Sequence, residues 1–334
     1  MARAWGATRD RLGIGAGSGA DAAGVQAAGQ RARRLASVQL VVASNPTARF
    51  GRAEPIGALV AARLADLGHT VQHIAAVDFA GQLEQTRFAM IQADALVVVG
   101  GDGMVHLGVN IVGGTSKRLL VVPAGSGNDF ATGLGLGTTE EVIEALPALL
   151  ASEPDRVDLI RIEHPDGVTL AAGIVSVGFD ADVNVRSFRL TRVPTRLRYQ
   201  AAILATVLRP RHRTFRIRLD DQPERTWRTL IAAVANHRTF GGGIAIAPDA
   251  DVRGGRLTTV LADELSYSRF VWLLSKVLRG GRHVGDARVY VTEAETVEIA
   301  SDETVIACAD GEIVGRLPVR CSVMPGALQV LTGR

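Results

Sequence analysis

The chain has 334 residues, of which 47% are hydrophobic and 4% are aromatic, and its formal net charge is +3. This length suits two domains, and the hydrophobic content excludes a chain that is disordered throughout. The few aromatic residues argue against nucleic-acid binding by base stacking. Lys117 and Lys276 are the only lysines, so we attribute the basic balance to an arginine-rich composition rather than to one binding surface.

Cysteine usage and hydropathy indicate a cytoplasmic protein. Cys308 and Cys321 are the only cysteines, too few for a disulfide framework or a four-cysteine zinc site, and we expect reduced thiols in the core. No apolar run reaches the roughly 18 residues of a membrane-spanning helix, and no apolar signal-peptide segment begins the chain. Residues 1–35 are rich in Ala, Gly and Arg without periodicity, so we expect a disordered tail.

From residue 36 to residue 157, apolar runs alternate with helical segments. Gly68 is the expected C-cap of the first helix. The run at 95–99 is continuously apolar, which is typical of a parallel strand buried on both faces. We expect strands at 38–43, 71–74, 95–99 and 119–122, and helices at about 56–67, 82–92 and 104–112. The rhythm predicts an α/β domain with a doubly wound, mostly parallel sheet.

After residue 158 the rhythm changes to short alternating runs separated by turn residues. This pattern predicts a mainly antiparallel β-sandwich over 158–334. We leave open that the last residues pack back on the first domain. We expect strands at 170–177, 214–219, 229–235, 257–261, 288–291, 296–299 and 305–309, with helices at about 196–208 and 268–278.

A first glycine loop, Gly100-Gly101-Asp102-Gly103, lies between an expected strand and an expected helix. Ligands of open α/β sheets bind at the carboxyl edge of the strands, and a helix N-terminus there offers free N–H groups to phosphate. A carboxylate beside phosphates suggests that Asp102 binds Mg²⁺ or orients a hydroxyl. Taken alone, the loop is equally well explained by a tight turn in which Asp102 caps the helix.

A second loop, Gly125-Ser126-Gly127-Asn128, follows the next strand. Ser126 is a candidate donor to a phosphate oxygen, and either Asn128 or Asp129 is the expected helix cap. A capped turn without a ligand remains the alternative, although two such loops in tandem are harder to attribute to chance. The chain lacks the G-x-x-x-x-G-K-[ST] motif and the protein-kinase motifs, which excludes those two classes of phosphate site.

The two loops resemble those of the catalytic domain of the diacylglycerol kinase and sphingosine kinase family, and most of all its bacterial soluble lipid kinase branch. The resemblance extends from about residue 36 to residue 332. Further motifs that match in chain order are Asn45-Pro46-Thr47, Val157-Asp158-Leu159, Gly178-Phe179-Asp180-Ala181, Asn236 with Gly241-Gly242-Gly243, and Asp310-Gly311-Glu312. The family usually continues G-G-D-G with Thr and an Asn-Glu pair, whereas this chain has Met104-Val105-His106-Leu107.

The resemblance implies an ATP-dependent lipid kinase of phospholipid biosynthesis that uses Mg²⁺ and converts diacylglycerol to phosphatidic acid. It implies that Glu312 is the general base, that Asp310 supports it, and that Asp102 and Asp158 bind magnesium. From the residues alone, Asp310-Gly311 is equally a hairpin-turn signal. The nucleotide-binding residues that the resemblance implies are Asn45, Pro46, Thr47, Gly100, Gly101, Asp102, Gly103, Gly125, Ser126, Gly127 and Asn128.

The stretch from Arg186 to Arg218 contains ten arginines around an apolar segment. A basic amphipathic element of this kind can dock on anionic lipid headgroups, which suggests peripheral contact with a membrane; a solvated helix face is the alternative. The sequence also leaves a homodimer as an open alternative.

Two alternative functions are also open. One is a kinase for another acceptor (ceramide, a sphingoid base or NAD), and the other is a non-catalytic protein that binds nucleotide and lipid.

Overall fold

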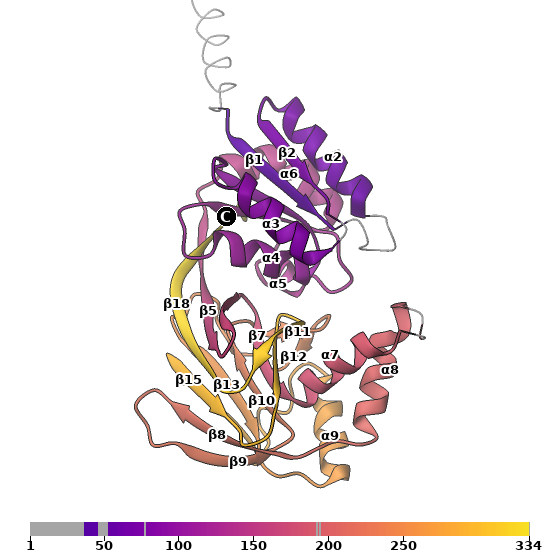
Figure 1. Ribbon diagram of the computed structural model, residues 1–334, viewed down its shortest axis with the longest axis vertical. Coiled ribbons are helices and arrows are strands. Elements are labelled where there is room, and N and C mark those ends of the chain that lie inside the picture. The colour runs from indigo at the N-terminus through magenta and orange to yellow at the C-terminus, as the bar shows by residue number, and fades with distance from the viewer. Residues whose placement is uncertain (1–36, 46–52, 77, 192, 194, 334) are drawn as a thin grey trace, which may run out of the picture. The chain divides into compact units, whose positions relative to one another are not determined.

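The computed structural model describes residues 37–45, 53–76, 78–191, 193 and 195–333 (Figure 1). The expected tail at 1–35 and the candidate residues Pro46 and Thr47 lie outside these ranges. In the described part of the chain, no helix is long and apolar enough to cross a membrane.

The N-terminal domain contains four parallel strands in the order β2-β1-β3-β4. Alternate residues of these strands enter two separate cores. Helices α3 and α4 contribute to the core on one face, and α2 and α6 to the core on the other, which confirms the doubly wound α/β prediction. The elements are β1 (Gln39–Ser44), α2 (Ala53–Asp66), β2 (Thr70–Ile74), α3 (Phe79–Ala89), β3 (Ala95–Gly100), α4 (Asp102–Val112), β4 (Arg118–Pro123), α5 (Asp129–Gly133) and α6 (Thr139–Ala151).

Strand β18 (Val319–Val330) connects this parallel sheet to the antiparallel strands that follow. Its end, at Gln329 and Val330, pairs in parallel with β4. Residues 320–324 and 328–330 of β18 pair antiparallel with β5 (Asp155–His164), beside which β18 lies in Figure 1. The sheet then continues from β18 through β15 (Thr296–Ala300), β8 (Arg213–Leu219) and β9 (Arg225–Thr229), and β6 (Gly167–Ala171) pairs with β5. Because β5 crosses the expected domain boundary at 157, that boundary stays a prediction.

A second sheet is entirely antiparallel and packs on the first. Its strands lie in the order β14-β13-β10-β7-β16-β17. One core contains Phe215 and Ile299 of the first sheet together with Val175 and Val234 of the second. Two packed sheets of this kind form the predicted β-sandwich. The strands are β7 (Ile174–Gly178), β10 (Ile231–Ala235), β13 (Leu257–Ala262), β14 (Val289–Ala294), β16 (Ile306–Ala309) and β17 (Glu312–Arg316).

Two predicted strands prove to be pairs of strands. The run at 170–177 divides at Ala172-Gly173 into β6 and β7, which lie in different sheets, and the run at 229–235 covers the end of β9 and all of β10. Both predicted helices of this part are present, as α8 (Thr195–Val207) and α9 (Tyr267–Val277). The remaining elements are α7 (Phe179–Arg189), β11 (Thr239–Phe240) and β12 (Ile244–Ala245).

Both cysteines are free thiols buried in the protein, as predicted. Burial raises the pKa of Cys308 and of Cys321 to about 12. Since the thiolate is the reactive form, neither thiol is reactive near neutral pH.

Candidate functional site

The two glycine loops lie backbone against backbone at the carboxyl edge of the parallel strands. The Ala124 amide donates to the Gly100 carbonyl at 2.8 Å. A Cβ placed on Gly125 would lie 2.3 Å from the Gly101 Cα, so a side chain there would force the loops apart. Ser126 is exposed beside them. The structure therefore brings the two predicted loops together, while their nucleotide contacts stay a prediction.

Asp102 connects the start of α4 to the start of α5 rather than capping α4. It is the first residue of α4, whose N-cap is Gly101 and has no side-chain cap bond. Its Oδ1 accepts from the Phe130 amide of α5 at 3.3 Å. Burial raises the pKa of Asp102, the Phe130 amide opposes this, and the nearby carboxylates of Asp129 and Asp310 add to it. The helix-cap alternative is wrong, and the half-buried carboxylate lies where a cation would stabilise its ionised form.

Asn128 is the N-cap residue of α5, one of the two predicted caps, but its side chain makes no cap hydrogen bond to the helix. Asn128 adopts a left-handed φ of 60°, and its Oδ1 accepts from the Gly125 amide at 2.9 Å, which closes the second loop on itself. The two oxygens of Asp129 accept from the amides of Gly242 and Gly243, each at 2.7 Å. Asp129 therefore ties the second loop to the glycine run that follows β11.

Asp310 and Gly311 form the two-residue turn between β16 and β17. Their φ angles of 52° and 87° are those of a type I′ hairpin, so the hairpin interpretation is confirmed. The same aspartate also anchors the turn. Its Oδ1 accepts from the Gly173 and Ile174 amides at 2.8 and 3.2 Å, and its Oδ2 accepts from the Ala172 amide at 3.0 Å.

Glu312 is the first residue of β17, directly after this turn. A Cβ placed on Gly103 would lie 3.1 Å from the Glu312 Oε1, so the carboxylate reaches the beginning of α4. Gly103 follows Asp102, which carries the other predicted catalytic carboxylate. Two motifs some two hundred residues apart in sequence thus meet at one glycine.

His106 is a site residue that sequence reasoning missed. Its Nδ1 lies 3.2 Å from the Asp310 Oδ2, and both side chains are buried. His106 follows Asp102 by four residues, the spacing that places two side chains on one face of a helix. This spacing from Asp102 is the sequence signal that could have identified His106. The neighbouring departures from the family pattern, Met104 and Leu107, are buried core residues of the N-terminal domain.

Asp158 is held by backbone amides. Its Oδ2 accepts from the Gly255 amide and its Oδ1 from the Gly326 amide, each at 2.7 Å. The described residues contain no group of three or more His, Cys, Asp or Glu side chains that could hold a metal ion. Magnesium on a nucleotide needs only one or two carboxylates beside the phosphates, and Asp102 fits that role. The metal role of Asp158 stays a prediction, as does the nucleotide role of Asn45, which is half-buried after β1.

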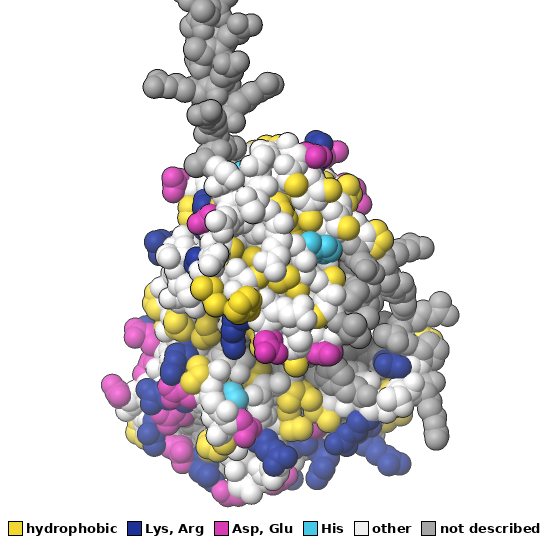
Figure 2. Space-filling model, turned by 45° about the horizontal axis from the view of Figure 1, so that its top comes forward, with side chains coloured by type: hydrophobic (Ala, Val, Ile, Leu, Met, Phe, Trp, Pro, Cys, Tyr) yellow, Lys and Arg dark blue, Asp and Glu magenta, His cyan; other side chains and the backbone are white. Residues whose placement is uncertain are grey.

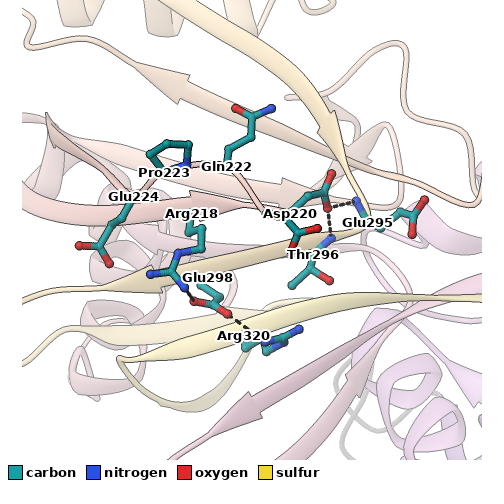
Figure 3. A pocket seen from close by; sticks show the side chains of 10 residues that line it. Arg218, Asp220, Gln222, Pro223, Glu224, Glu295, Thr296, Glu298 and Arg320 are labelled. Atoms are coloured by element: carbon teal, nitrogen blue, oxygen red, sulfur yellow. Dashed lines mark hydrogen bonds and ion pairs between the residues drawn. The ribbon is translucent and has the colours of Figure 1, made fainter.

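A separate polar hollow of about 680 Å³ lies on the antiparallel part of the first sheet (Figure 3). Glu298 pairs there with Arg320 at 2.9 Å and with Arg218 at 3.6 Å. Asp220 accepts from the Thr296 amide at 2.9 Å. Glu298 and the two arginines therefore neutralise one another within the hollow. The hollow also shares no residue with the two glycine loops or the Asp310-Gly311 turn, so we do not assign it as the active site.

Two family models match the chain in sequence. Residues 39–162 match the diacylglycerol kinase catalytic domain. Residues 173–332 match the YegS C-terminal NAD kinase beta sandwich-like domain. Together these matches cover the α/β domain and the β-sandwich.

Named relatives agree with these models. A diacylglycerol kinase of Mycobacterium tuberculosis (strain H37Rv) is 33% identical over 304 residues, which are 90% of this chain and 97% of the relative. The "Probable lipid kinase YegS-like" of Chromohalobacter salexigens is 31% identical over 70% of this chain and 74% of its own length. A crystal structure of a diacylglycerol kinase from Bacillus anthracis shares the fold, with a TM-score of 0.63 at 15% identity, over 88% of this chain and 96% of the other. The chain therefore belongs to the bacterial branch of the diacylglycerol kinase catalytic-domain family.

Proposed function

We propose that the protein transfers the γ-phosphoryl group of ATP to a lipid hydroxyl, and that diacylglycerol is the acceptor. The proposal is based on one observation: the Glu312 carboxylate lies beside Gly103, the residue that directly follows Asp102. A phosphotransferase needs a phosphate-binding loop and a group that accepts the acceptor's proton within reach of one another. The family resemblance assigns phosphate binding to the Gly100–Gly103 loop and proton acceptance to Glu312.

The nucleotide side uses both glycine loops. The N-terminus of α4 favours phosphate oxygens, because the helix dipole and the free N–H groups of its first turn both stabilise negative charge. Bound magnesium supplies electrostatic stabilisation of the transferring phosphoryl group. Asp102 would hold that ion, and Asp158 would contribute with the lone pairs that its two amide contacts leave free. The other nucleotide contacts in the proposal are Asn45, Pro46, Thr47, Gly100, Gly101, Gly103, Gly125, Ser126, Gly127 and Asn128.

The acceptor side uses the β16–β17 hairpin. Glu312 accepts the proton of the lipid hydroxyl as the lipid oxygen forms its bond to the γ-phosphorus. The bond between that phosphorus and the β–γ bridging oxygen breaks, and ADP leaves. Asp310 positions Glu312, because three amides and His106 hold the turn that precedes it.

The choice of acceptor rests on the relatives. The Mycobacterium tuberculosis protein matches over nearly its full length and is named a diacylglycerol kinase. Ceramide, a sphingoid base and NAD remain alternative acceptors for the same reaction. The presence of both Asp102 and Glu312 favours an enzyme over a protein that only binds nucleotide and lipid. We also propose that it acts from the cytoplasm on an anionic membrane surface.

The test is a labelled-ATP assay with Mg²⁺ and a panel of acceptors. Diacylglycerol, ceramide and sphingosine are presented in mixed micelles, and NAD in solution. We expect labelled phosphatidic acid. A labelled product from another acceptor instead would reassign the substrate. ATP binding without a product from any acceptor would reject the enzyme and leave the binding protein.

A further inference from the structure

Helix α9 has one buried apolar face and exposes further large apolar side chains on the rest of its surface. Phe270 and Leu273 are buried in a core cluster at the end of the sandwich. Outside that face, Tyr267 is 51% exposed and Trp272 is 41% exposed, and Leu278 just after the helix is 60% exposed. Several exposed large apolar side chains on one helix, rather than single scattered ones, indicate a binding surface.

Cations accompany these exposed apolar side chains. Residues 265–285 contain no Asp or Glu but four basic residues, Arg269, Lys276, Arg279 and Arg282. The Arg269 guanidinium carbon lies 4.1 Å from the Trp272 ring centroid, and the Lys276 Nζ lies 3.8 Å from it. Arg269 also pairs with Asp286 at 2.6 Å, whereas the other three cations form no ion pair with any described residue. The exposed surface of α9 therefore combines large apolar side chains with positive charge.

We propose that this face of α9 docks on an anionic lipid bilayer. Tryptophan and tyrosine favour the boundary between headgroups and acyl chains, and aliphatic side chains such as Leu278 enter it. Lysine and arginine beside them attract anionic headgroups. A second copy of the same face would bring like charges together, which disfavours self-association. Figure 2 shows Arg and Lys side chains at the lower right, the side on which Figure 1 draws α7, α8 and α9.

The position of α9 connects this surface to the candidate site. Val277, the last residue of α9, and Phe240 both pack against the core cluster that contains Ile174. The Ile174 amide holds Asp310, and the glycines that follow Phe240 hold Asp129. The end of the docking helix thus rests on the segments that position the site. This step rests on the proposed lipid kinase function: docking through α9 would bring a membrane-borne acceptor to the acceptor side.

The experiment is vesicle co-sedimentation of the full chain without ATP. Vesicles of phosphatidylcholine with phosphatidylglycerol are compared with vesicles of phosphatidylcholine alone. A leucine or tryptophan side chain that enters the membrane contributes more than about 1.4 kcal/mol of binding free energy, by about 25 cal/mol per Å² of apolar area. We therefore expect Trp272→Ala with Leu278→Ser to weaken binding to the anionic vesicles about tenfold or more. Lys276→Gln with Arg279→Gln removes two positive charges and keeps the apolar side chains, and we expect about a fivefold loss per charge.

A matched control is available on α3. Phe88 is 76% exposed and Ile91, just after the helix, is 69% exposed. Phe88→Ser with Ile91→Ser removes exposed apolar side chains of similar size outside the docking face, and we expect unchanged vesicle binding. Equal binding by the wild type and both α9 double variants would overturn the proposal, as would an equal loss in the α3 control.

Tryptophan fluorescence gives a second, local measurement. The chain has three tryptophans, so Trp5→Phe with Trp227→Phe leaves Trp272 as the only one. We expect its emission to shift to shorter wavelength with the anionic vesicles, and an unchanged spectrum overturns the docking.

Kinase assays separate this proposal from the proposed function. In the α9 variants, the ratio of activity on vesicle-borne diacylglycerol to activity on a monomeric short-chain diacylglycerol should fall. A ratio equal to that of the wild type overturns the docking and leaves the kinase intact. Binding through α9 by a protein that phosphorylates no acceptor supports the docking and rejects the kinase.

Discussion

The Nδ1 of His106 lies 3.2 Å from the Oδ2 of Asp310, although 204 residues separate them in the chain. His106 is on α4, which begins at Asp102, and Asp310 begins the turn that leads to Glu312. The contact therefore joins the helix of the phosphate loop to the hairpin of the proposed base. We infer that His106, which belongs to the stretch after G-G-D-G that departs from the family pattern, positions the turn before Glu312.

Replacing His106 with leucine tests this role. Asp310 would keep its amide contacts but lose its link to α4, so the Glu312 carboxylate would be less well placed. We expect kcat to fall by about tenfold to a hundredfold, the range for a small misplacement of a catalytic group, while the KM for ATP stays unchanged. Steady-state kinetics with varied ATP and diacylglycerol measure both constants.

Two further variants control the His106 experiment. His106→Asn keeps a hydrogen-bond donor, and we expect it to recover part of the lost kcat. His212→Leu removes a histidine outside the site and should leave kcat unchanged. A His106→Leu enzyme with normal kcat, or one in which only the KM for ATP rises, would exclude the positioning role.

Glu312→Gln removes the proposed base while it preserves the size of the side chain. A general base contributes about a hundredfold to ten-thousandfold, so kcat should fall by that range while ATP binding persists. Single-turnover kinetics and ATP titration measure the two quantities. Glu303→Gln, at an exposed position before β16, is the matched control. If Glu312→Gln retained wild-type turnover with the same pH profile, Glu312 would not be the base.

The glycine loops could be predicted from sequence because their geometry is local. A buried strand, a glycine run and a helix follow each other in the chain, and the order alone places Gly100 and Gly125 at one edge of the sheet. The I′ turn at Asp310-Gly311 is equally local, since both residues tolerate positive φ.

The partners of the polar side chains could not be predicted in this way. Asp129 looks like a helix cap by position, yet its carboxylate accepts from the amides of Gly242 and Gly243, more than a hundred residues later. Strand β18 was missed for a similar reason: it pairs with β15, β5 and β4, so its burial varies along its length and no simple alternation results. Long-range pairing overrides the local pattern in both cases.

The close approach of the two loops predicts a strong effect of Gly125→Ala. The added Cβ would lie 2.3 Å from the Gly101 Cα, and backbone rather than a flexible side chain must move. We expect a loss of about 1–3 kcal/mol in the free energy of unfolding and at least tenfold weaker ATP binding. Denaturant unfolding and ATP titration measure these. Gly285→Ala meets no atom within 4 Å and is the control. Equal stability and ATP affinity in the two variants would contradict the packed-loop arrangement.

Asp180 should make stability depend on pH in the opposite direction to a salt-bridged carboxylate. Burial raises its pKa from 3.8 to about 6, and the hydrogen bond from the Ser176 hydroxyl, at 2.6 Å, opposes this only in part. Between these two values the folded protein keeps a proton that the unfolded chain has lost. Its contribution to the free energy of unfolding is therefore highest below pH 4 and falls by about 3 kcal/mol as the pH rises to above 6.

The variant Asp180→Asn isolates this contribution, because the amide cannot ionise. We expect the difference in free energy of unfolding between Asp180→Asn and the wild type to grow in favour of the variant as the pH rises from 4 to about 7. Urea unfolding at several pH values measures it. Asp302→Asn, at an exposed aspartate that pairs with Arg216, is the control and should not reproduce that increase. A difference that stays constant with pH would mean that Asp180 titrates near its usual value, with water reaching its carboxylate in the folded protein.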